Sequence, residues 1–434
     1  MSERDDATQQ RSHSLAINAK LLCSGIFVAG RSADDLLAND LPFDTWPERF
    51  SFSEISIAID QARQTVTLAD GSGLRRTAVH HPGYGCTIIP EQMHGVAFNP
   101  PTLDPAPDDP RPWPLGNGGG ADTAVGDRAA LDAALDQAFD DSRWPAPART
   151  RAVVAVHGGR LVAERYAPGF SAATRQINWS MGKSLTAALV GMLVGDGALE
   201  LDAPAPVAEW HGAGDPRREI TLRHLLQMRS GLEYRRLEPQ DPAFYTPDNH
   251  HLQVYFGAID VFAQSIGRPL EFPPGSHGRY RNCDPLTLGA IVRRTVEARG
   301  EDYLTFPHRR LFAPIGMHAQ VLEPDPWGNF IMTGFEYGIA RDWARFGLLH
   351  LRDGDWFGTQ VLPRGWAAVV SSPSPASGEL ARGEYGGLFW LNRSGRLPNV
   401  PEDAYWAAGA MGQVTMVIPS RDAVIVRLGH TSDA

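Results

Sequence analysis

The chain has 434 residues, 43% of them hydrophobic and 21% charged, which is enough to bury a full core and excludes a chain disordered by composition. Its formal net charge of −10 argues against nucleic acid or an anionic membrane as a partner. No run of about 20 apolar residues predicts a membrane span. Cys23, Cys86 and Cys283 lack the spacing of a metal site and are too few for a disulfide scaffold.

The N-terminal region begins with the polar stretch MSERDDATQQRSHS, which lacks the apolar run of a signal peptide and favours a cytoplasmic over a periplasmic location. The next stretch, LAINAKLLCSGIFVAG, is apolar but interrupted by Asn18 and Lys20, and its short runs predict a buried strand. Alternating apolar residues between about 50 and 80 predict a small antiparallel meander. Cys23 and Cys86 each lie in a short apolar run of this region, so we expect them to be neighbours.

A run rich in proline and glycine separates this region from the rest. Prolines occur at positions 100, 101, 105, 107, 110, 112 and 114, and glycines at 116 and 118–120. No regular helix or central strand tolerates such a run. The sequence therefore predicts a β-rich extension with a proline-rich linker over residues 1–115 and a larger unit over residues 116–434.

The larger unit is predicted to open with a helix that carries Leu131 and Leu135 on one face. AVVAVHGGRLVAERY predicts two strands joined by a Gly158-Gly159 turn, and NWSMGKSLTAALVGMLVGDG predicts a helix of about 14 residues. Residues from about 205 to 325 are mostly helical in pattern, and strand patterns return after residue 380. These patterns predict one sheet built from both ends of the unit around a helical lobe.

Lysine is rare in this chain. Of the 40 lysines and arginines, only Lys20 and Lys183 are lysines. A buried lysine can lose its proton near neutral pH, and arginine cannot. Lysines kept under such a bias toward arginine therefore invite a chemical explanation.

Lys183 belongs to an S-x-x-K tetrad, Ser180-Met181-Gly182-Lys183, at the start of the predicted apolar helix. A spacing of three places both side chains on one helix face. The free N–H groups and positive dipole end of the helix favour an alkoxide on Ser180 and an oxyanion beside it. The alternative is structural: Ser180 would cap the helix and Lys183 would lie on the surface.

Two further segments favour the catalytic interpretation. Tyr280 and Asn282, two residues apart after Pro273-Pro274-Gly275, can both face one cleft from a loop. The stretch AAGAMGQ, residues 407–413, leads into a strand, where a substrate could lie along the backbone at Gly409 and the N–H of Ala410 could complete an oxyanion hole.

Serine with lysine, then tyrosine with asparagine, then a glycine-rich strand resembles the three-motif order of the serine β-lactamase and penicillin-binding superfamily. Residues 220–232, ITLRHLLQMRSGL, and residues 339–366 resemble its class C β-lactamases, family VIII carboxylesterases and 6-aminohexanoate-dimer hydrolase. The resemblance covers residues of about 145 to 430. It implies an α/β fold of the α+β type, in which an antiparallel sheet flanked by helices faces an all-helical lobe across the site.

The resemblance also implies roles. Ser180 matches the nucleophile, Lys183 the base and Tyr280 the proton shuttle, while Asn282 matches a polar residue of the cleft. The expected reaction is hydrolysis of a small-molecule ester or linear amide, without a metal or organic cofactor; the oligomeric state stays open. Ala407 stands where the family has a lysine or histidine that binds the β-lactam carboxylate. A D-peptidase or β-lactamase, or a sensor that stays acylated, remain the alternatives.

Overall fold

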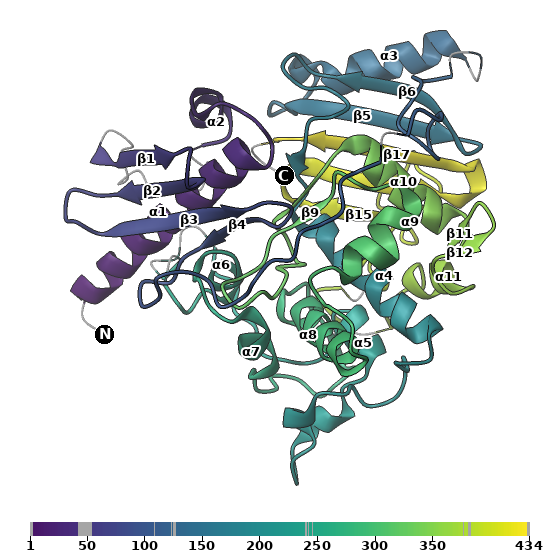
Figure 1. Cartoon of the computed structure of the whole chain (residues 1–434). Helices are drawn as coiled ribbons and strands as arrows, with labels where there is room; N and C mark the ends of the chain where they lie inside the picture. Colours follow the sequence, from purple (N-terminus) through teal and green to yellow (C-terminus); the bar gives the residue numbers. More distant parts are fainter. Residues whose placement is uncertain are drawn as a thin grey trace.

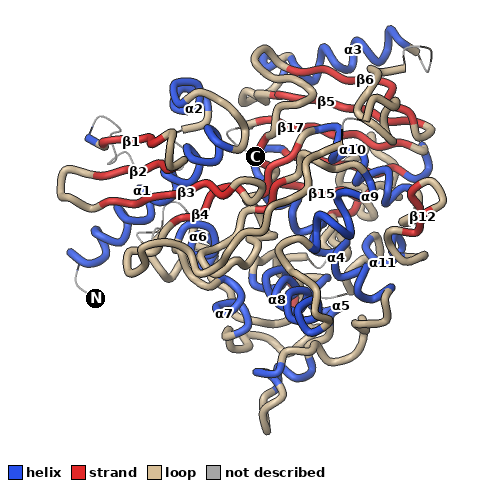
Figure 2. The backbone as a smooth tube through the Cα atoms, in the orientation of Figure 1, coloured by secondary structure: helices blue, strands red, loops and turns tan. Residues whose placement is uncertain are grey.

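The computed structural model describes residues 3–41, 54–107, 109–122, 124, 127–238, 241, 243, 244, 246–375, 377–380 and 383–431. Figure 1 shows a small N-terminal sheet with a long helix on one side, a larger sheet beside it, and a lobe of helices below. In Figure 2 most of the strand residues lie in these two sheets, and the lobe consists of helices and loops. The predicted mixture of antiparallel sheet and flanking helices is confirmed.

The elements have the following bounds. The α-helices are α1 (Glu3–Phe27), α2 (Ala33–Asn39), α3 (Arg128–Phe139), α4 (Gly182–Gly195), α5 (Leu222–Leu226), α6 (His250–Phe256), α7 (Val261–Ile266), α8 (Cys283–Ala298), α9 (Ala313–Ile315), α10 (Ala340–Leu351) and α11 (Trp366–Val370). The strands are β1 (Ser56–Asp60), β2 (Thr65–Ala69), β3 (Arg75–His81), β4 (Gly85–Ile88), β5 (Thr150–His157), β6 (Arg160–Tyr166), β7 (Gln176–Ile177), β8 (His277–Gly278), β9 (Val321–Leu322), β10 (Glu336–Gly338), β11 (Asp355–Trp356), β12 (Thr359–Gln360), β13 (Ser377–Gly378), β14 (Trp390–Leu391), β15 (Tyr405–Gly409), β16 (Gln413–Ile418) and β17 (Ala423–Gly429).

The larger sheet has the strand order β14-β15-β16-β17-β5-β6, with antiparallel pairing throughout. Because β17 pairs with β5, strands from both ends of the larger unit form one sheet, as predicted. Leu135 of α3 packs against Val153 on one face. Gly347 of α10 lies against Val424 on the opposite face. Val424 pairs with Val156, and the side chains of Val156 and Val153 point to opposite faces because they are three residues apart on β5.

Helix α4 lies between this sheet and the lobe, where it packs against β15 and α8. Its residues from Gly182 to Leu193 are all buried, so the apolar composition covers every side of the helix rather than one stripe. The prediction of a helix of about 14 residues is confirmed, and the helix ends at Gly195. Gly191 lets the ring of Trp366 approach, because a Cβ there would lie 2.4 Å from that ring.

The prediction of a buried strand near the N-terminus is wrong, because these residues form part of α1. Every residue from Ser14 to Gly25 is buried, and a short apolar run buried on all sides has no periodicity that separates helix from strand. The two polar interruptions have partners: Asn18 donates to the Ser14 carbonyl at 2.9 Å, and Lys20 pairs with Glu323 at 3.0 Å. The helix packs on the β1-β2-β3-β4 meander, which was predicted correctly.

Cys23 of α1 and Cys86 of β4 lie together, as predicted. Both are buried and neither forms a disulfide. Burial, and then the contact with the Cys23 thiol, raise the pKa of the Cys86 thiol far above its ordinary value. A thiol held in its neutral form is a poor nucleophile, so this pair contributes to packing.

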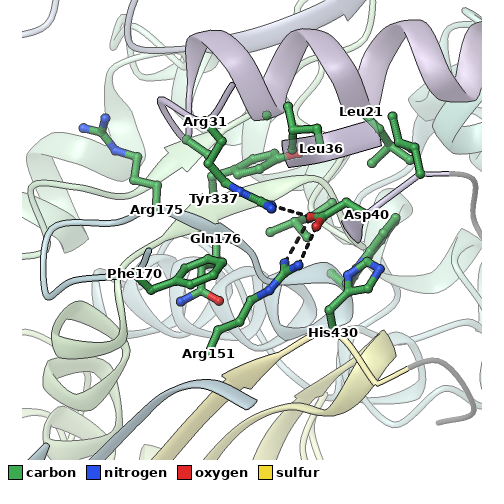
Figure 3. A pocket seen from close by; sticks show the side chains of 15 residues that line it. Leu21, Arg31, Leu36, Asp40, Arg151, Phe170, Arg175, Gln176, Tyr337 and His430 are labelled. Atoms are coloured by element: carbon green, nitrogen blue, oxygen red, sulfur yellow. Dashed lines mark hydrogen bonds and ion pairs between the residues drawn. The ribbon is translucent and has the colours of Figure 1, made fainter. Parts of the chain in front are cut away.

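An ion-paired cluster joins the segment after α2 to β5 (Figure 3). Asp40 accepts from Arg31 at 2.6 Å and from Arg151 of β5, which joins the two parts. The guanidinium groups outweigh the effect of burial and lower the pKa of Asp40 to about 2. Asp40 and Trp179 both line a small cavity at this cluster. The segment after α2 therefore lies close to the residues that lead into α4.

The proline-rich linker is held against the larger unit by α10. The Arg345 side chain donates to the carbonyls of Pro114 and Gly116, and that of Arg341 donates to those of Asn117 and Gly119. In Figure 1 this dark blue segment runs across the front of the molecule. Among the described residues, no helix combines the length and apolar character needed to cross a membrane.

Candidate active site

A tight turn between β7 and α4 carries Ser180. The chain before it is fixed by β10, because the N–H of Asn178 donates to the Glu336 carbonyl at 2.9 Å. Trp179 has φ = 50°, a left-handed conformation that bulky residues rarely adopt, and its ring packs edge-on against Phe335 at 5.2 Å. Ser180 is thereby presented, half-buried, at the N-terminal end of α4.

Lys183 follows one helical turn later and contacts Ser180 directly. Its Nζ lies 2.9 Å from Ser180 Oγ and donates to the Thr333 carbonyl at 2.7 Å. The side chain is 1% exposed. When the amine is neutral, the carbonyl takes one N–H and the lone pair can accept the serine proton. This contact has the geometry that a general base requires.

Burial lowers the pKa of Lys183 from its ordinary 10.5 to about 7. The carboxylate of Glu336 opposes this shift, and the positive charge of Arg236 adds to it. Burial also raises the pKa of Glu336 well above its ordinary value. Desolvation thus pushes both groups toward their neutral forms, and an appreciable part of Lys183 is unprotonated near neutral pH.

Glu336 of β10 occupies the start of α4, beneath the tetrad. The N–H of Gly182 donates to Glu336 Oε1 at 2.6 Å. A Cβ on Gly182 would lie 2.3 Å from Oε2, so the carboxyl group can approach the helix only because this position is glycine. The carboxyl group thus accepts from the first N–H of α4, which also faces the backbone carbonyls of Trp179 and Ser180.

Tyr280 lies on the other side of the amine. Its ring centroid is 4.9 Å from Lys183 Nζ, and its hydroxyl lies near enough to the Ser180 side chain for the two to interact. The ring stacks on Trp390 at 5.4 Å and meets Tyr385 edge-on at 5.8 Å, which fixes its orientation. Burial raises the pKa of Tyr280 above its ordinary value, so the phenol is protonated and able to donate.

Asn282 is fully buried beneath the site and does not line its surface. Its Nδ2 donates to the Tyr255 hydroxyl at 3.0 Å and lies 3.2 Å from Nδ1 of His251. Tyr255 in turn donates to the Thr333 carbonyl at 2.8 Å, the same carbonyl that receives Lys183. Asn282 is therefore joined to the lysine through two intermediate groups.

The glycine-rich strand β15 ends beside the serine turn. Gly409 is packed so tightly there that a Cβ would lie 2.1 Å from the Asn178 carbonyl. Ala410 is exposed and begins a short turn in which Met411 is left-handed, with φ = 62°. Arg427 holds this turn by donating to the carbonyls of residues 411 and 412. Ala407 is fully buried, so its side chain faces the core.

The structure brings together residues that the sequence did not single out. Thr333, Glu336, Tyr255 and His251 complete the surroundings of Lys183, and all four contribute through contacts between segments far apart in the chain. Glu336 lies three residues before the segment whose resemblance was recognised, so an alignment of relatives could have exposed it. Within the described residues, no three His, Cys, Asp or Glu side chains are grouped to hold a metal ion.

Comparison with known proteins gives a consistent result. The sequence matches the Beta-lactamase family over residues 135–433. The 6-aminohexanoate-dimer hydrolase of Paenarthrobacter ureafaciens is 25% identical over 307 residues, which cover 65% of this chain and 73% of that protein.

Solved structures share the fold. A family VIII carboxylesterase superposes with a TM-score of 0.56 at 15% identity, over 73% of this chain and 94% of the other. A D-stereospecific amidohydrolase from Streptomyces sp. superposes with a TM-score of 0.50 at 18% identity, over 71% of this chain and 96% of the other. Because the family match spans more than half of its length, the chain belongs to the beta-lactamase family and is an enzyme of the serine hydrolase class.

Proposed function

We propose that this enzyme hydrolyses an ester or linear amide bond through an acyl-enzyme on Ser180. The contact between Lys183 and Ser180, 2.9 Å long in a buried setting, carries the proposal. An amine with a pKa of about 7 is matched to proton transfer at neutral pH.

In the first half-reaction, Ser180 Oγ attacks the substrate carbonyl while its proton passes to the neutral amine of Lys183. The N–H groups of Ser180 and Ala410 would hold the oxyanion of the tetrahedral intermediate. Tyr280 gives its proton to the leaving oxygen or nitrogen as that bond breaks, and it regains a proton from Lys183. The products are the free alcohol or amine and the acyl-enzyme.

In the second half-reaction, a water molecule attacks the acyl carbonyl. As Tyr280 passes its proton to the neutral amine of Lys183 and takes one from the water, the protonated lysine returns a proton to Ser180 Oγ while the ester bond breaks, which releases the acid and restores the enzyme. No group other than water enters this cycle. The role of Asn282 is to hold Tyr255, and through it the carbonyl that positions Lys183.

We infer a preference for esters and linear amides over β-lactams from the residues of strand β15. A cation on this strand would be needed to hold the carboxylate of a β-lactam, and position 407 is an alanine buried in the core. Loss of a charge-assisted hydrogen bond costs about 1.5–3 kcal/mol. The relative from Paenarthrobacter ureafaciens is named 6-aminohexanoate-dimer hydrolase, and a dimer of an amino acid of this kind is joined by a linear amide bond, which supports this preference.

The test compares the wild-type enzyme with Ser180→Ala on 4-nitrophenyl butyrate, a linear amide and a chromogenic cephalosporin. We expect turnover of the ester, little of the cephalosporin, and a loss of several orders of magnitude in Ser180→Ala. A fluorophosphonate probe should label the wild type and leave Ser180→Ala unlabelled. A preference for the cephalosporin would make the enzyme a β-lactamase, and a single stoichiometric burst would make it a sensor. Labelling of Ser180→Ala would refute the assignment of the nucleophile.

A further inference from the structure

Arg236 is an exposed arginine near the proposed catalytic groups, and no described carboxylate pairs with its guanidinium. Among the described residues, its side chain has no ion pair or hydrogen bond. Its positive charge nevertheless acts on Lys183, Tyr280 and His251, three groups of the site. A guanidinium without a partner beside a nucleophile is available to a ligand.

The backbone around Arg236 is held in place on both sides. The N–H of Arg235 donates to His250 at 3.0 Å, and the N–H of Leu237 reaches Asn249 at 3.5 Å. Both partners lie at the start of α6, the helix that carries His251 and Tyr255. The position of residue 236 is therefore tied to the helix that supports Lys183.

A second connection ties this segment to Tyr280. The side chain of Arg281, next to Tyr280 in the chain, is fully buried and donates to the Leu232 carbonyl. Tyr234 is also buried, and its hydroxyl lies 3.5 Å from Nδ1 of His251, which contacts Asn282. Residues 232–237 thus form a fixed edge of the site, from which the side chain of Arg236 projects into solvent.

Other arginines near the site already have partners. Arg396 lies over the ring of Trp390 at 5.7 Å and pairs with Glu384 at 3.8 Å. Arg427 donates to backbone carbonyls of the turn after β15. Arg279 pairs with two glutamates, at 2.8 and 3.1 Å. Among the described residues, a ligand could engage Arg236 without breaking an ion pair or a hydrogen bond of its side chain, unlike these three arginines.

We infer that Arg236 binds a carboxylate on the substrate and makes the enzyme selective for anionic esters or amides over neutral ones. This inference rests on the proposed function, because it adds a second recognition point to the same site. The net charge of the chain is −10, which would repel an anionic substrate. A positive charge at the site offsets this repulsion locally. Arg236 belongs to the segment before α6 and not to β15. The substrate carboxylate that it binds would therefore lie at a different position from the carboxylate of a β-lactam held by a cation on β15.

The experiment compares three chromogenic esters with the same six-carbon acyl chain length. 4-Nitrophenyl hexanoate is neutral, 4-nitrophenyl hydrogen adipate carries a carboxylate in the acyl group, and the hexanoate ester of 5-hydroxy-2-nitrobenzoic acid carries one in the leaving group. We expect Arg236→Gln to reduce kcat/KM for one of the anionic esters about tenfold or more relative to the neutral ester. The loss should fall mainly on KM, and Arg236→Lys should restore part of it.

Arg235→Gln is the matched control, because Arg235 is the adjacent exposed arginine and its nearest charged partner is Glu233 at 3.6 Å. It should leave the ratio of anionic to neutral kcat/KM within about twofold, since the charge of Arg235 is already paired with Glu233. Equal effects of the two substitutions, or an unchanged ratio for both anionic esters in Arg236→Gln, would overturn the inference. A wild-type enzyme that hydrolyses none of the three esters would instead contradict the proposed function.

Discussion

Gly182 and Glu336 are in contact at the start of α4, where the N–H of the glycine donates to the carboxyl group at 2.6 Å and no room is left for a Cβ. The contact joins the S-x-x-K tetrad to β10, a strand more than 150 residues away in the chain. It explains why one of the two variable positions of the tetrad is glycine here.

Gly182→Ala should displace Glu336 and lower both stability and activity. Overpacking of a buried site costs about 1–3 kcal/mol. Gly191→Ala is the control on the same helix, because its Cβ would meet Trp366 at 2.4 Å, away from the serine. Thermal unfolding should show similar losses for the two variants, whereas kcat should fall much further in Gly182→Ala. Equal kcat values would mean that the contact with Glu336 has no part in the chemistry.

Lys183→Arg should be nearly as inactive as Lys183→Ala. Arginine keeps the positive charge but cannot release a proton at neutral pH, so it cannot act as a base. The assay is kcat/KM for 4-nitrophenyl hexanoate, with circular dichroism to verify the fold of each variant. If Lys183→Arg kept most of the wild-type rate, Lys183 would have an electrostatic or structural role.

The pH profile of the enzyme should report the pKa of Lys183. Burial lowers this pKa to about 7, and the base acts only when neutral, so kcat/KM should fall about tenfold per pH unit below that value. Burial is the main cause that lowers the pKa of Lys183, and the positive charge of Arg236 lowers it further. Arg236→Gln should therefore raise this pKa and move the acid limb to higher pH. Arg235→Gln should leave the limb in place. A limb that moved to lower pH in Arg236→Gln would contradict this electrostatic account.

Lys20→Met should destabilise the protein strongly. Lys20 and Glu323 form an ion pair at 3.0 Å with side chains 1% and 0% exposed, and removal of one partner of a buried pair costs about 3–5 kcal/mol. Burial raises the pKa of Glu323, so protonation of this carboxyl should recover part of the loss as the pH falls. The measurement is urea unfolding at several pH values.

Arg223→Met is the control for this prediction, because Arg223 pairs with Asp202, whose side chain is 71% exposed. An exposed pair contributes at most about 1 kcal/mol. A loss in Lys20→Met no larger than that in Arg223→Met would show that the N-terminal helix does not support the rest of the fold.

Local patterns in the sequence were enough for the parts of the fold that local interactions decide. The strand–turn–strand unit at Gly158-Gly159, the extent of α4 and the contact between Ser180 and Lys183 follow from periodicity and from the geometry of one helical turn. The strand predicted near the N-terminus is instead part of α1, because burial on all sides removes the periodicity that distinguishes helix from strand.

The surroundings of Lys183 could not be predicted in this way. Thr333 contacts the lysine, and the charges of Glu336 and Arg236 act on its pKa, all three from segments that are remote in the chain. Nothing in the spacing of a single sequence encodes such an arrangement. The resemblance supplied the serine, lysine and tyrosine. It did not supply the groups that adjust the pKa of the lysine, because these depend on packing between segments.

The burial of both lysines has a practical consequence for chemical labelling. Lys20 and Lys183 are the only lysines of the chain, and each is 1% exposed. The native enzyme should therefore resist a lysine-specific endoprotease, and an amine-reactive dye should modify little beyond the terminal amine. Digestion or dye uptake at Lys20 would then mark opening of the N-terminal helix, which gives a readout of local unfolding that needs no engineered reporter.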